Sequence, residues 1–168
     1  MSGLIRNLLT LLRALLPARR LDRGRTDDRF NAHFTITPFD CGLRVLKSDK
    51  YLQLAEAAQL DYLLRTGLLR TLLARRIGFI NAAQLIKFTR PIPMFARVRV
   101  ETAVAFADSR CAYFSHAFSC GGQSHGEVLV KMKFKQGALT IPPRDLITQA
   151  FEGKPAHLER WDSALEAM

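Results

Sequence analysis

The sequence offers little that would support a disulfide framework, a structural zinc site or a membrane span. Its cysteines, Cys41, Cys111 and Cys120, are odd in number and lack CxxC spacing, so we expect free thiols in a reducing compartment. The histidines are too scattered along the chain to predict a zinc motif. No apolar run without charges reaches the length of about 18 residues that a transmembrane helix needs.

Acidic residues are fewer than basic residues. The chain has 25 Lys and Arg against 15 Asp and Glu, a formal net charge of +10 at pH 7. This excess suits an anionic partner such as a membrane surface, a phosphorylated small molecule or a nucleic acid, and it equally suits a plain solvated basic surface. Aromatic residues are not interleaved with the basic clusters, and no helix-turn-helix or RNP-like motif occurs, so the sequence disfavours nucleic acid.

The first 17 residues combine leucines with isolated basic residues. At helical spacing the leucines share one face, Arg6 and Arg13 lie on the opposite face, and Pro17 ends the pattern. No basic region precedes the apolar stretch, which argues against an export signal. We expect residues 1–28 to form an amphipathic helix and a charged linker. The helix either lies in a bilayer interface or packs on its own domain or on a partner subunit. We expect the protein to be cytoplasmic, and if the helix lies in a bilayer, to contact the inner face of a membrane.

Residues 29–141 contain the patterns of one α+β domain. We expect a strand at 33–39, a long helix that Ser48 or Asp49 caps and Gly67 ends, and a short helix before Gly78. The long helix is apolar around most of its girth, which is typical of a helix wrapped by other structure. Long alternating strands then follow with short turns, which predicts an antiparallel meander, and residues 142–168 form a helical tail.

Three stretches resemble the hotdog-fold acyl-CoA thioesterases related to 4-hydroxybenzoyl-CoA thioesterase, in the branch with a hydrophobic N-terminal leader. They are "DKYLQLAEAAQLDYLLRTGLLRTLLARR", "AAQLIKFTRPI" and "GEVLVKMKF". The resemblance implies a curled antiparallel sheet around a central helix, a homodimer or dimer of dimers, and an acyl-CoA or other acyl thioester as substrate. It implies no cofactor.

The sequence departs from that family where its catalytic motif belongs. The family carries Asp-x-Asp and then His-Met-Asn-Asn before the helix, whereas here the latter four positions hold "VLKS", residues 45–48. The two aspartate positions hold Phe39 and Cys41, and Asp40 falls between them. A one-residue bulge would bring Asp40 into the place of the catalytic carboxylate. Alternatively, Asp40 is a turn residue ahead of Gly42.

Five further residues are candidates for the site or its surroundings. Glu56 matches an acidic position common in the family, or else faces solvent as an ordinary helix residue. Tyr51 matches the tyrosine that begins the family's helix, and Arg90 in "TRPI" belongs to a surface that could hold the phosphates of CoA. Gln59 falls among apolar residues, so it needs a partner in the sheet or in the ligand. His116 shares the face of Phe114 and Phe118 and is expected to be a hydrogen-bonded core histidine.

Thioester hydrolysis requires few catalytic groups. A carboxylate must attack the carbonyl or deprotonate a water, and N–H groups at the start of the helix, residues 47–51, can polarise the carbonyl oxygen. If the altered motif no longer supports this chemistry, the protein is a non-enzymatic acyl-binding or scaffold protein of the same fold.

Overall fold

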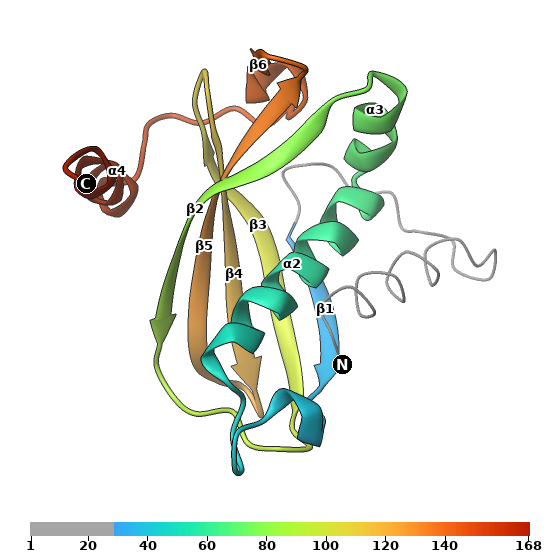
Figure 1. Cartoon of the computed structure of the whole chain (residues 1–168), viewed down its shortest axis with the longest axis vertical. Coiled ribbons are helices and arrows are strands. Elements are labelled where there is room, and N and C mark those ends of the chain that lie inside the picture. Colours follow the sequence, from blue (N-terminus) through green and yellow to red (C-terminus); the bar gives the residue numbers. More distant parts are fainter. Residues whose placement is uncertain (1–28) are drawn as a thin grey trace.

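A computed structural model describes residues 29–168, and the predicted leader helix and linker lie outside these described residues (Figure 1). The strands follow the order β1-β3-β4-β5-β2 in one antiparallel sheet, and β6 pairs with the end of β5 beyond the part that pairs with β4. The strands are β1 (Phe30–Thr35), β2 (Gly78–Phe88), β3 (Arg97–Ala107), β4 (Ala112–Cys120), β5 (Gln123–Gln136) and β6 (Leu139–Ile141). The helical segments are η1 (Pro38–Asp40), α2 (Ser48–Arg65), α3 (Leu68–Ala74), η2 (Pro143–Asp145) and α4 (Ala156–Glu166).

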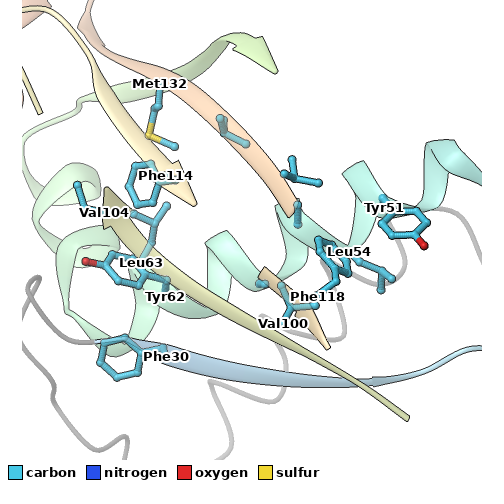
Figure 2. Close-up of a cluster of buried hydrophobic side chains, with 14 of the residues drawn as sticks. Phe30, Tyr51, Leu54, Tyr62, Leu63, Val100, Val104, Phe114, Phe118 and Met132 are labelled. Atoms are coloured by element: carbon cyan, nitrogen blue, oxygen red, sulfur yellow. The ribbon is translucent and has the colours of Figure 1, made fainter. Parts of the chain in front are cut away.

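The sheet curls around α2, as the resemblance implied, and the main core lies between them (Figures 1 and 2). From α2, Leu54, Tyr62 and Leu63 are fully buried, and they meet Val100 of β3 and Phe114 of β4 in the same cluster. Figure 2 shows these side chains converging from the helix and the sheet. Alternation along β3, β4 and β5 supplies the inward face, so the period-2 pattern of the sequence correctly identified the strands.

The ends of α2 illustrate one correct and one incorrect prediction. Gly67 adopts φ 72°, the left-handed conformation expected just past the end of the helix. At the other end Lys47 is the N-cap, in extended conformation and without a capping side-chain bond. The predicted cap at Ser48 or Asp49 is therefore wrong, because both residues already lie in the first turn.

The first strand is shorter at its C-terminal end than the sequence pattern predicts. It ends at Thr35 rather than at residue 39, because Pro38 begins the 3-10 turn η1. Pro38 fixes its own φ and lacks an N–H group, so it cannot continue the ladder with β3. A proline just past its end suits an edge strand, and β1 is the last strand on its side of the sheet.

The C-terminal helix α4 packs on the outer face of the sheet. Leu158 and Trp161 form a second apolar cluster with Tyr113 and Leu129. Beside that cluster, Asp162 accepts hydrogen bonds from Lys131 at 2.8 Å, from the Tyr113 hydroxyl at 2.6 Å and from Lys154. Of the predicted tail, residues 156–166 are helical, whereas the stretch that begins with Pro142 and Pro143 forms only the short turn η2.

Candidate functional site

Asp40 lies at the end of η1 and is fully buried. Its Oδ2 accepts hydrogen bonds from the Thr37 backbone N–H at 3.0 Å and from the Thr37 hydroxyl at 2.6 Å, while its own N–H bonds the Thr37 carbonyl at 2.9 Å. These contacts form a capping box, in which the side chains at the two ends of a turn satisfy each other's backbone groups. In this conformation the carboxylate closes a turn and is shielded from solvent.

The loop from Cys41 to Lys47 connects that turn to α2. Gly42 N–H donates to the Val45 carbonyl at 3.0 Å, and Lys47 N–H donates to the Asp40 carbonyl at 3.0 Å. Since Lys47 provides no side-chain cap, the opening N–H groups of α2 are not taken up by a capping side chain. The Lys50 N–H donates to the Lys47 carbonyl at 3.0 Å. The N–H groups of Ser48 and Asp49 are available to an acceptor from a ligand, with the helix dipole in support.

Tyr51 and Arg90 are brought together beside the first turn of α2. Tyr51 is buried, its ring packs edge-on against Phe88 with centroids 5.0 Å apart, and its hydroxyl donates to the Arg90 carbonyl at 3.5 Å. Figure 2 shows the Tyr51 ring on the same side of the helix as Phe118. Burial raises the pKa of Tyr51, so it stays a neutral packing residue. The Arg90 guanidinium lies on the surface and donates to the Gln123 side chain.

Glu56 and Gln59 lie one turn apart on the flank of α2 that faces β2. Gln59 is buried, and its Nε2 lies 3.5 Å from Oδ1 of Asn81 on β2. Positions i and i+3 share a helix face, so Glu56 points toward the same region. Glu56 is partly buried, and within the part of the chain that the structure describes its carboxylate has no hydrogen bond or ion pair. Of the two predicted carboxylates, it is the one that is free to act on a ligand.

His116 stands behind Gln59 in the core, where the sequence predicted a hydrogen-bonded histidine. Its Nδ1 lies 2.9 Å from the Thr102 hydroxyl and its Nε2 lies 3.2 Å from Gln59 Oε1. Burial lowers its pKa to about 3, so the ring is neutral near pH 7. A neutral ring that donates from Nε2 to the Gln59 oxygen must accept from Thr102 at Nδ1, which fixes the Gln59 amide with its NH₂ group toward Asn81.

Asn81 is the residue of this site that sequence reasoning missed. It is exposed on β2 next to a register shift between Asn81 and Ala83. The signal was a polar residue at an inward position: its partner Met132 is fully buried, so Asn81 faces the helix side of the sheet. Sequence alone predicted that Gln59 has a partner in the sheet or in the ligand, without identifying it.

Two kinds of feature are absent from the described residues 29–168. They contain no helix long and apolar enough to cross a membrane. They also contain no cluster of three or more His, Cys, Asp or Glu residues that could hold a metal ion.

Comparisons with known proteins identify the family of the chain. The model of the thioesterase-like superfamily matches residues 36–146. Over 132 residues the chain is 24% identical to protein THEM6 of Drosophila melanogaster. This match covers 76% of this chain and 67% of that protein.

Solved structures with the same arrangement include a hypothetical protein from Thermus thermophilus, at TM-score 0.64 and 22% identity, covering 71% of this chain and 93% of that one. They also include 4-hydroxybenzoyl CoA thioesterase from Pseudomonas sp. strain CBS-3, at TM-score 0.62 and 18% identity, covering 70% of this chain and 96% of that one. At these identities the likeness shows the fold alone, and it confirms the predicted hotdog architecture.

Proposed function

Because the chain belongs to the thioesterase-like superfamily, we propose that it binds an acyl thioester such as acyl-CoA and hydrolyses it. The observation that carries the proposal is the flank of α2, where an unengaged carboxylate lies one turn from an amide held in one orientation. Glu56 supplies the first and Gln59 the second. Such a pair can activate a water and hold a polar group of the substrate beside it.

In this proposal Glu56 is the general base. A carboxylate without a bound partner can accept the proton of an attacking water, and the free N–H groups at the start of α2 can stabilise the charge that develops on the thioester oxygen. Asp40 is the alternative carboxylate. Its bonds with Thr37 and its complete burial support the turn role, so a catalytic role would require η1 to open.

The CoA nucleotide is expected to lie against the basic surface near Arg90. The guanidinium is exposed, and its hydrogen bond to the Gln123 side chain holds it in place. Arginine binds phosphate through paired N–H donors, which suits it to this role. Tyr51 supports the same surface through its bond to the Arg90 carbonyl.

The free edge of β2 supports a homodimer. Among the described residues, β2 pairs with β5 on one side only, and its eleven residues include exposed Phe79, Ile80 and Leu85. A long edge strand with apolar side chains exposes unpaired backbone groups that a second copy can cover. We propose that two β2 strands meet across a two-fold axis, which would place the Glu56 flank of each protomer near the seam.

Paired conservative substitutions test the enzymatic proposal. Glu56→Gln keeps the shape of the side chain and removes its basicity, so acyl-CoA turnover should fall by about 10²–10⁴-fold while binding is retained. Asp40→Asn retains an oxygen for Thr37 and should leave turnover within a few-fold of the wild type. Loss of activity in Asp40→Asn with retention in Glu56→Gln would transfer the catalytic role to Asp40.

A non-catalytic acyl-binding or scaffold protein is the second candidate function. Two observations favour it. The family's motif positions hold Val45, Leu46, Lys47 and Ser48, and the Asp40 carboxylate is hydrogen-bonded to Thr37 within a turn. Binding of acyl-CoA in calorimetry, with no hydrolysis of chains from acetyl to palmitoyl, would select this alternative.

A further inference from the structure

Four large apolar side chains are exposed on two loops at one end of the molecule. Their exposed fractions are 77% for Phe39, 95% for Leu43, 42% for Val45 and 70% for Phe95. These four residues are termed the apolar loop patch. Phe39, Leu43 and Val45 lie between the end of β1 and the start of α2, and Phe95 lies just before β3. Figure 1 shows both loops at the same end of the sheet, opposite α3 and β6. Single exposed apolar residues are ordinary, but a group of this kind marks an interaction surface.

Backbone hydrogen bonds hold the two loops together. Met94 N–H donates to the Arg44 carbonyl at 2.9 Å, and Leu46 N–H donates to the Ile92 carbonyl at 2.8 Å. Phe95 N–H donates to the Ile36 carbonyl at 2.9 Å, which ties its loop to the end of β1. The patch is therefore presented by a fixed backbone.

Phe95 combines exposure with an unfavourable backbone conformation. Its φ is 65°, in the left-handed region where any residue with a β-carbon is strained. Glycine would suit this position better, and an exposed ring adds little packing to the fold. A strained residue that presents an aromatic ring to solvent is a candidate for a binding role.

Charge around the patch is almost entirely positive. Arg44, Lys47 and Arg97 are exposed on the same loops or next to them. Over residues 36–50 and 90–97 the acidic residues are Asp49, which is exposed, and Asp40, which is fully buried. Apolar side chains with a basic surround complement a surface that offers hydrocarbon beneath anionic groups.

The proposed dimer would leave this patch open. Phe39 follows β1 and Phe95 precedes β3, and β1 and β3 lie on the side of the sheet opposite to β2. A second copy paired along β2 would therefore meet the other edge of the molecule.

We propose that the apolar loop patch docks on an anionic lipid surface. Phe39, Leu43 and Phe95 enter the boundary between head groups and acyl chains, while Arg44 and Lys47 contact the lipid phosphates. This contact is separate from the predicted membrane helix of residues 1–17. It does not depend on thioester hydrolysis.

Vesicle co-sedimentation of the full chain tests the binding. Vesicles of phosphatidylcholine mixed with phosphatidylserine should retain the protein better than phosphatidylcholine alone. Phe39→Ala/Phe95→Gly should lower the partition coefficient by about tenfold or more, because two apolar anchors are lost. Phe95→Gly also relieves the φ strain, so the variant should remain folded. Leu73→Ala/Leu139→Ala, which removes exposed leucines at the opposite end, should bind within about twofold of wild type.

A depth measurement separates the patch from the leader. Phe95→Trp should gain fluorescence quenching by brominated lipid relative to wild type, whereas Leu139→Trp should not. A protein that sediments with vesicles but shows no quenching at position 95 is bound elsewhere, and the proposal is then wrong. Failure of the wild-type protein to bind either kind of vesicle also refutes the proposal. A change of mass in light scattering for Phe39→Ala/Phe95→Gly refutes it as well, because it would assign the patch to contact with a second copy.

Discussion

Acidification below pH 6.5 should destabilise this protein through His116. The ring is fully buried and both nitrogens are hydrogen-bonded, and burial lowers its pKa from 6.5 to about 3. Below pH 6.5 the unfolded chain therefore binds a proton that the folded protein does not take up until about pH 3. Linkage then lowers the free energy of unfolding by roughly 3 kcal/mol between pH 6.5 and about pH 4.

Denaturant unfolding across this pH range, in wild type and His116→Gln, measures the effect. The glutamine amide can donate to Gln59 Oε1 in place of Nε2 but does not titrate. It leaves Thr102 without its acceptor, so we expect the variant to be less stable at neutral pH by about 1–3 kcal/mol. Its stability should then depend less on pH, and the two curves should converge as the pH approaches 4.

Other titrating groups are common to both proteins and cancel in the difference. His33→Gln, at an exposed histidine, is the matched control and should follow the wild-type pH profile. Parallel curves for wild type and His116→Gln would refute the reasoning, because they would mean that His116 takes up its proton equally in the folded and unfolded states.

Three other predictions concern assembly and the ends of the chain. Light scattering at micromolar concentration should give a dimer or a multiple of it, and a monomer would contradict the proposed pairing of β2. If residues 1–17 lie on a membrane, their deletion should reduce the membrane-bound fraction to the part that the apolar loop patch retains, with little change in melting temperature. Unfolding or loss of the dimer on deletion would instead make the helix a packing element. Asp162→Asn should destabilise the protein by about 2 kcal/mol in thermal unfolding, because Lys131 and Lys154 lose a partly buried anionic partner. Burial opposes ionisation of Asp162, but the hydrogen bonds from those lysines and from Tyr113 lower its pKa to about 2, so the aspartate is charged near pH 7. An unchanged melting temperature in Asp162→Asn would refute the role of Asp162 in holding α4.

The fold was predictable because its strongest features are local. Alternation in β3, β4 and β5 marks strands, and a helix without a continuous polar face must be wrapped, as α2 is. The misjudged boundaries depend on competition between neighbouring residues. Pro38 could end a strand or begin a turn, and Thr37 with Asp40 decides for the turn by forming a capping box.

The candidate site was less predictable, since its geometry joins residues far apart in the sequence. A buried amide at Gln59 implied a partner, yet nothing local indicated His116 or Asn81, which are 57 and 22 residues away. Their pairing depends on which strands lie opposite α2 and on the register of β2 with β5. The register shift at Asn81 is a tertiary feature that periodicity does not reveal.

The two carboxylates show why family position alone cannot assign a catalytic role. Asp40 is closer in sequence to the family's aspartate, but its Oδ2 is bonded by both the N–H and the hydroxyl of Thr37. Activating a water with that oxygen would mean giving up these bonds in a fully buried turn. Glu56 carries no such cost, because its carboxylate has no bond to break among the described residues. Loss of the histidine and asparagines of the motif therefore need not abolish hydrolysis, provided that the helix supplies the base and the adjoining amides orient the substrate.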